Sequence, residues 1–208
     1  DRDRIFEVKD SIVSQWGRVD IVINNAGITL QPTKMQEIEY ENFKRMIDIN
    51  LWGVVHACQA FLSELEKQPE ASLVNISSLL GLMGHAGATH YAATKFGVRG
   101  ITESLWVELM DTNVVPLLVH PGTVHTNINL NSPEFASRQE QELANQKFQN
   151  IPGITPEKAA ELIVRAITMK KRRLIIGKET RFMKLMTRVF YNSYPFVVKQ
   201  LSKVYNID

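Results

Sequence analysis

Tyr91 and Lys95 are the residues whose types and spacing most directly suggest acid–base chemistry. They lie four positions apart in Tyr91-Ala92-Ala93-Thr94-Lys95, so on a helix both side chains share one face. A phenol has an ordinary pKa of about 10, and a nearby cation favours its phenolate form. We therefore expect Lys95 to lower the pKa of Tyr91 and to prepare it for proton transfer. The alternative is a solvated helix face without function.

Two further polar residues occur at positions that suggest a function. Ser78 follows the apolar run Leu73–Ile76, and α/β sheets present functional side chains beyond the carboxyl ends of their strands. Ser77 is the neighbouring alternative. Asn50 falls in the middle of a predicted helix over 40–67. Because Asn is a mediocre helix former, its position predicts a hydrogen-bonding role.

Two loops offer backbone and amide groups to a ligand. Asn24-Asn25-Ala26-Gly27 follows a β-branched run and combines amides with a flexible backbone. Pro121-Gly122-Thr123-Val124-His125-Thr126 follows another, and its Thr126 hydroxyl can bind a ligand amide. Each loop can equally be an ordinary turn that leaves a strand.

The elements that must position these residues alternate along the chain. Short β-branched runs at 19–23, 73–76, 114–119 and 174–176 predict buried parallel strands, and helical patterns cover 2–16, 40–67, 89–111 and 156–170. This alternation predicts an α/β fold with a doubly wound, parallel Rossmann-type sheet. The polar stretch 127–153 is expected to be a long loop or lid.

Composition and charge exclude several classes of protein. The 208 residues are 44% hydrophobic and 22% charged, which is typical of a soluble globular domain. The net charge of +2 divides into +9 over residues 165–208 and −7 over the rest. An acidic main body argues against nucleic-acid binding. The single Cys58 requires no oxidising compartment, so we expect a cytoplasmic location.

In order and spacing, the motifs resemble the short-chain dehydrogenase/reductase family. The resemblance covers about residues 1–177 and implies NAD or NADP as cofactor. It implies that Tyr91 is the general acid/base, that Ser78 binds the substrate oxygen and that Lys95 lowers the tyrosine pKa and contacts the nicotinamide ribose. Asn50 would hold a water in a proton relay. The implied cofactor-binding residues are Asn24, Asn25, Ala26, Gly27, Tyr91, Lys95, Pro121, Gly122 and Thr126.

The front end departs from the family pattern. The sequence contains no T-G-x3-G-x-G loop, which binds the pyrophosphate in the family, and it opens inside a helical pattern. We therefore expect a Rossmann-type domain over 1–177 that is truncated at its N-terminus. The residues that select NAD or NADP would lie in the missing part.

The expected function is an oxidoreductase that interconverts a carbonyl and a secondary alcohol on a small molecule. The apolar residues Leu79, Leu80, Leu82 and Met83 after Ser78 indicate a hydrophobic substrate, or they only pack. An inactive fragment or a binding module of the same fold is the alternative. The long helical patterns favour a homo-oligomer. The spacing of the five histidines predicts no metal site.

The segment 178–208 is predicted to be a basic, amphipathic helical tail. Phe182, Leu185, Met186, Val189 and Phe190 have helical spacing, and Pro195 breaks the pattern. Such a tail packs on the domain or on a second subunit. The alternative is a peripheral membrane protein that contacts lipid through residues 180–205, since Lys and Arg beside aromatic residues are typical of interfacial helices.

Overall fold

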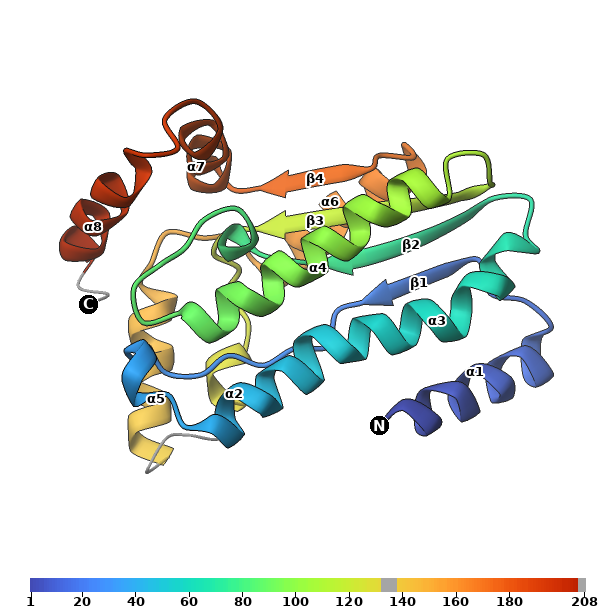
Figure 1. Cartoon of the computed structure of the whole chain (residues 1–208), viewed down its shortest axis with the longest axis horizontal. Helices are drawn as coiled ribbons and strands as arrows, with labels where there is room; N and C mark the ends of the chain where they lie inside the picture. Colours follow the sequence, from blue (N-terminus) through green and yellow to red (C-terminus); the bar gives the residue numbers. More distant parts are fainter. Residues whose placement is uncertain (132–137, 206–208) are drawn as a thin grey trace.

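The protein contains a parallel four-stranded sheet between layers of helices (Figure 1). The structure is a computed structural model and describes residues 1–131 and 138–205. The strands are β1 (Ile21–Asn24), β2 (Ala71–Ile76), β3 (Val114–Pro121) and β4 (Arg173–Ile176). They lie in the order β1-β2-β3-β4, and every neighbouring pair is parallel. The predicted parallel α/β fold is confirmed.

The two central strands are nearly continuous runs of apolar residues because both of their faces are covered. On β2, Leu73 belongs to a core beneath the helices of one face, and its neighbour Val74 belongs to the core beneath the other face. The strand β1 forms an edge of the sheet, where Ile21 and Ile23 are about half exposed.

Helices cover both faces of the sheet (Figure 1) and bury a separate apolar cluster on each. One cluster includes residues of α1 (Arg2–Trp16), α3 (Gly53–Glu66) and α4 (Thr89–Glu108), and the other includes residues of α6 (Pro156–Thr168). Helix α1 begins at its cap Asp1 and ends at Gly17, which has the positive φ of 72° that glycine accommodates most easily. Helix α6 begins at the cap Thr155 with Pro156 in its first turn, where its missing N–H costs no helix hydrogen bond.

The predicted helix over 40–67 is interrupted by a π-helical turn. It consists of α2 (Tyr40–Ile47), the turn η2 (Asp48–Trp52) and α3. The wider turn contains Asn50, whose side chain bonds to the backbone of the loop after β1. Turns of this type occur frequently at functional sites.

Where the structure describes the 127–153 stretch, it is not the loop or lid that its polarity predicts, and residues 132–137 lie outside the described ranges. It contains the short helical turn η4 (Ile128–Asn131) and the helix α5 (Arg138–Gln149). The latter contains four Gln and two Glu, which are good helix formers. The polarity of the segment therefore reflects an exposed helix.

The C-terminal segment folds back onto the domain. It forms α7 (Lys178–Val189) and α8 (Tyr194–Tyr205), and Pro195 lies in the first turn of α8. Met183 of α7 and Val198 of α8 are buried against Met83, which follows the short turn η3 (Leu79–Gly81). The tail thus packs across the expected boundary at residue 177. No helix in the described ranges has the length and apolar character to span a membrane.

Gly81 and Gly100 provide a matched test of packing. A Cβ at Gly81 would collide with Ser77 Oγ and lie 2.9 Å from the backbone oxygen of Lys95, whereas a Cβ at Gly100 in α4 would meet nothing within 4 Å. We expect Gly81→Ala to reduce the free energy of unfolding by about 1–3 kcal/mol. Gly100→Ala should raise it by about 0.5–1 kcal/mol through helix propensity. Urea unfolding measures both changes, and equal effects would contradict the close packing of Gly81.

Candidate active site

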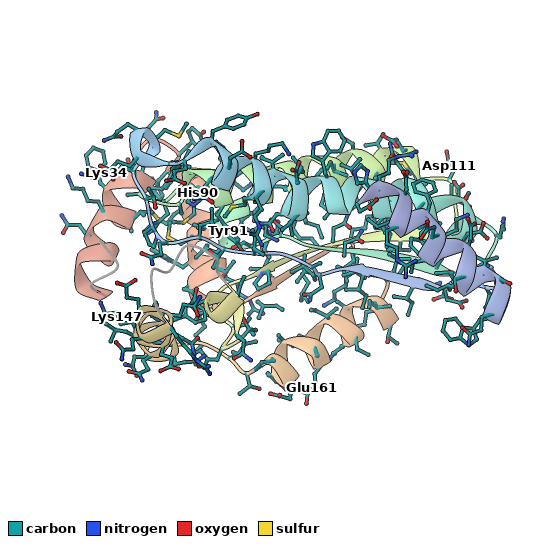
Figure 2. All side chains as sticks on the ribbon, turned by 90° about the horizontal axis from the view of Figure 1, so that it is seen from below. Lys34, His90, Tyr91, Asp111, Lys147 and Glu161 are labelled. Atoms are coloured by element: carbon teal, nitrogen blue, oxygen red, sulfur yellow. The ribbon has the colours of Figure 1, made fainter. Side chains whose placement is uncertain are left out.

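Tyr91 and Lys95 lie in the first two turns of α4, close to the carboxyl end of β2. Tyr91 is half-buried, and Figure 2 shows it far from Asp111, which lies beyond the other end of the same helix. Lys95 is only 5% exposed, and its Nζ lies 5.6 Å from the centre of the Tyr91 ring. The ammonium donates a hydrogen bond of 3.0 Å to the backbone oxygen of Ile76. A buried lysine therefore stands directly beside the phenol.

Burial controls the protonation of this pair. It raises the pKa of Tyr91, and a hydrogen bond from Ser78 opposes that change. Burial lowers the pKa of Lys95 to about 8. Burial therefore sets the net direction for both groups, because desolvation disfavours their charged forms, and the lowering of the tyrosine pKa by Lys95 stays a prediction. In the folded protein Tyr91 is a neutral phenol at physiological pH.

The two neighbouring serines have different environments. Ser77 is buried, and its Oγ donates a hydrogen bond of 2.9 Å to the backbone oxygen of Lys95. Ser78 is half-buried, its Oγ accepts a bond of 3.1 Å from the backbone N–H of Leu80, and its hydroxyl opposes the effect of burial on the pKa of Tyr91. Ser77 therefore attaches α4 to the sheet, while Ser78 faces the phenol.

Asn50 connects three parts of the site. Its Oδ1 accepts a hydrogen bond of 2.8 Å from the N–H of Ile28, and its Nδ2 donates a bond of 2.9 Å to the oxygen of the same residue. The Nδ2 also lies 3.4 Å from Thr94 Oγ1, which itself donates to the backbone oxygen of Tyr91. Asn50 thus holds the loop after β1 against the start of α4. Sequence reasoning missed the contribution of Thr94.

The Asn24–Gly27 loop divides into a structural and an open part. Asn24 Nδ2 donates to Asn75 Oδ1 at 2.7 Å, so this amide joins β1 to β2. Asn25 and Ala26 are exposed. Gly27 lies at the centre of the site, since a Cβ there would be 3.2 Å from the Oδ1 of Asn50 and 3.6 Å from the Nζ of Lys95. A ligand at this loop therefore meets mostly backbone.

The Pro121–Thr126 segment is held by the end of the sheet and by α7. The N–H of Gly122 donates to the backbone oxygen of Ile176 at 2.9 Å. A Cβ on Gly122 would collide with the side chains of Glu179 and Thr180. Thr126 is half-buried, and its N–H donates to Val124. Within the described ranges no hydrogen bond joins this segment to Tyr91 or Lys95.

His120 is a site residue that the sequence pattern did not single out. It is fully buried at the end of β3, and its Nδ1 lies 2.8 Å from the backbone oxygen of Ser78. Burial lowers its pKa to about 4, so the ring is neutral. Because a carbonyl oxygen only accepts, Nδ1 must carry the proton. His120 thus holds the backbone of Ser78 in place, and its position before Pro121 was the available signal.

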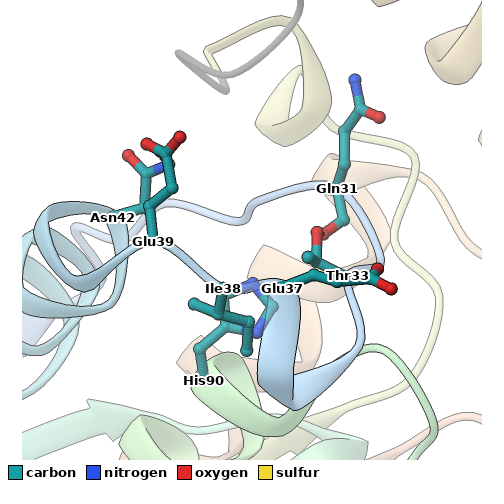
Figure 3. A pocket seen from close by; sticks show the side chains of 7 residues that line it. All are labelled: Gln31, Thr33, Glu37, Ile38, Glu39, Asn42 and His90. Atoms are coloured by element: carbon teal, nitrogen blue, oxygen red, sulfur yellow. Dashed lines mark hydrogen bonds between the residues drawn. The ribbon is translucent and has the colours of Figure 1, made fainter.

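A cavity of about 450 Å³ opens beside His90, the neighbour of Tyr91 (Figure 3). Its lining is polar and acidic, and it consists of Gln31, Thr33, Glu37, Ile38, Glu39, Asn42 and His90. None of Ser78, Tyr91 and Lys95 is among these residues. In the described parts of the chain, no three His, Cys, Asp or Glu side chains gather as metal ligands would.

Sequence comparison identifies relatives that are named as oxidoreductases or reductases. The family described as short chain dehydrogenase matches residues 1–136. The putative oxidoreductase SadH of Mycobacterium tuberculosis is 32% identical over 200 residues, which cover 95% of this chain and 72% of that protein. The 3-oxoacyl-[acyl-carrier-protein] reductase FabG of Thermotoga maritima is 38% identical over 136 residues, or 65% of this chain and 55% of that reductase. The chain thus spans only part of each relative.

Solved structures share the fold. A short-chain dehydrogenase from Streptomyces avermitilis has a TM-score of 0.76 and 26% identity, over 98% of this chain and 78% of that one. The closed form of a serine dehydrogenase complexed with NADP+ has a TM-score of 0.77 and 27% identity, over 85% of this chain and 71% of that one. These proteins contain the same arrangement of sheet and helices.

The buried ammonium of Lys95 predicts a characteristic pH dependence of stability. Its pKa falls from 10.5 to about 8 on folding, so between these values the unfolded chain holds more protons and stability rises with pH. At pH 7 the full cost of burial is present. Lys95→Met removes this cost, so at neutral pH its free energy of unfolding should exceed that of the parent. This difference should shrink by roughly 3 kcal/mol between neutral pH and pH ~10.5.

Urea unfolding at a series of pH values without added nucleotide measures this difference. Lys34→Met, at an exposed position (Figure 2), is the control and should keep the parent profile because it relieves no burial. Parallel pH profiles for Lys95→Met and the parent protein would show that the ammonium is not desolvated.

Proposed function

Because the chain belongs to the short-chain dehydrogenase/reductase family, we propose that it is an NAD(P)-dependent oxidoreductase that interconverts a carbonyl and a secondary alcohol. The observation that carries this proposal is the convergence of Ser78, Tyr91 and Lys95 at the carboxyl end of β2. A neutral phenol, a hydroxyl directed at it and a buried ammonium form a proton-donating set.

In the reductive direction, Tyr91 gives its proton to the substrate oxygen. Its raised pKa keeps the phenol protonated until that step. Ser78 Oγ already accepts from the N–H of Leu80, so its own hydrogen can be donated to the substrate oxygen. Lys95 uses one of its three N–H groups on the oxygen of Ile76, and the remaining groups can stabilise the developing phenolate.

The residues present fit the nicotinamide end of a dinucleotide. Gly27 allows the backbone to approach Asn50 and Lys95 more closely than a side chain would permit. Asn25, Ala26 and the segment from Pro121 to Thr126 would line the cofactor, and Lys95 would contact its ribose. When bound, NAD or NADP supplies or accepts the reducing equivalent. The complex of the serine dehydrogenase with NADP+ supports this cofactor class.

A hydrophobic substrate is supported by the surroundings of Ser78. Leu79 and Leu80 are half-buried beside an apolar cluster of Met83, Met183 and Val198. Leu82 and Met83 are themselves buried, so beside Ser78 they contribute packing. The tail helices therefore supply part of the apolar wall next to the candidate site.

The remaining features of the proposal concern assembly and the alternative function. Self-association is supported by two exposed apolar side chains. Trp52 of η2 is 48% exposed, and Val107 of α4 is 69% exposed. The alternative, a binding module without turnover, predicts the same geometry. Only a measurement of catalysis separates it from an enzyme.

Tyr91→Phe is the decisive variant for catalysis. The ring and its packing remain while the transferable proton is lost, so turnover should fall by roughly 10²–10⁴-fold with little change in cofactor affinity. The assay follows NADH and NADPH absorbance with a panel of hydrophobic ketones. Tyr40→Phe, at a position 74% exposed, is the matched control and should keep parent activity. Near-normal turnover in Tyr91→Phe would remove Tyr91 from the mechanism.

Cofactor binding is tested separately by calorimetric titration with NAD, NADH, NADP and NADPH. Lys95→Met should bind the preferred nucleotide on the order of tenfold more weakly, because a charge-assisted hydrogen bond to the ribose is lost. Unchanged affinity would contradict the ribose contact. Binding by the parent protein without turnover of any ketone or alcohol would favour the binding module.

A further inference from the structure

A second pocket, outside the candidate active site, gathers positive charge without a role in the proposed reaction. Its lining residues come mainly from α4, β4 and α7, and its volume is about 490 Å³. Figure 1 shows where these elements lie. Its lining consists of Leu82, Phe96, Arg99, Arg173, Lys184, Thr187, Arg188, Tyr191 and Tyr194. The four cations come from three different elements, so tertiary folding alone brings them together.

The charges in this pocket are not balanced. Arg99 Nε donates to Glu103 Oε1 at 2.8 Å, and Arg173 donates to the same oxygen. One carboxylate therefore serves two guanidinium groups. Lys184 and Arg188 have no carboxylate partner within the described residues. The pocket thus holds an excess of three positive charges.

The cations of this pocket repel one another, and one of them carries an unused hydrogen-bond donor. Burial, together with the charges of Arg173, Arg188 and Arg99, lowers the pKa of Lys184. The guanidinium of Arg173 lies 4.8 Å from the centre of the Trp106 ring, and its buried Nε has no hydrogen-bond acceptor in the described structure. Both the repulsion and the unused donor would be relieved by an anion.

We propose that this pocket binds a phosphate group. Guanidinium and ammonium groups that converge from several directions match an oxyanion with several acceptor oxygens and up to two negative charges. A planar, singly charged carboxylate would satisfy fewer of these donors. Tyr191 and Thr187 add hydroxyl groups to the lining.

The phosphate can belong to a dissolved metabolite or to a phospholipid headgroup. The tail also exposes aromatic residues, since Tyr191 of the pocket is 70% exposed, and Phe190 and Phe196 are 54% and 74% exposed. Aromatic residues next to a phosphate-binding pocket suit a lipid whose acyl chains lie against them. A dissolved phosphate ester would use the cations alone.

Calorimetric titration with inorganic phosphate and glycerol 3-phosphate tests the shared chemistry. The parent protein should bind both, and Lys184→Gln and Arg188→Gln should each bind on the order of tenfold more weakly. Arg181→Gln is the matched control, because Arg181 is exposed on the same helix and does not line the pocket. Tyr91→Phe should bind phosphate normally, so this result is independent of the proposed reaction.

Co-sedimentation with vesicles distinguishes the two sources. Retention on phosphatidylcholine vesicles that contain phosphatidic acid, lost in the Lys184→Gln/Arg188→Gln double variant and kept in Arg181→Gln, identifies a lipid headgroup. Phosphate binding in solution without such retention identifies a dissolved phosphate ester. The proposal would be overturned if the parent protein showed neither phosphate binding nor selective retention on the vesicles. Equal losses in Lys184→Gln, Arg188→Gln and Arg181→Gln would also overturn it.

Discussion

The burial of one ammonium group is the constraint on which the rest of the site depends. Lys95 Nζ lies among the backbone oxygen of Ile76, the ring of Tyr91 and the loop at Gly27. Burying a charge is costly unless polar partners surround it. The protein meets this requirement with backbone groups at the carboxyl end of β2, and the neighbouring loop must therefore carry a residue without a side chain.

The same requirement explains how α4 is attached to the sheet. Ser77 donates to the backbone oxygen of Lys95, and Gly81 packs closely against that oxygen. Two turns further along the helix, Thr102 accepts from Asn75 Nδ2, while Asn75 Oδ1 accepts from Asn24. Hydrogen bonds between buried polar groups thus fix α4 in one position relative to β1 and β2. A catalytic geometry depends on this precision more than on apolar packing.

Helix α7 connects the candidate active site with the basic pocket. Near its N-terminus, Glu179 and Thr180 pack against Gly122 at the end of β3. One to two turns later, Lys184 and Arg188 line the pocket, while Met183 on another face belongs to the apolar cluster beside η3. A ligand in the pocket would therefore contact the same rigid element that closes the end of the sheet. This arrangement gives the basic residues of the tail a structural role that the charge of the tail alone does not reveal.

The sequence by itself determined the alternation of strands and helices, the position of Tyr91 four residues before Lys95, and the family. These features depend on local periodicity and short-range spacing, which can be read directly from the order of the residues. Only the tertiary structure decided which serine faces the phenol, because Ser77 and Ser78 differ in their long-range partners. It also decided the protonation of Tyr91, where burial raises the pKa of the phenol and the hydrogen bond of Ser78 only partly opposes that change. Burial and shared charges arise from distant elements that meet in space, so no local pattern records them.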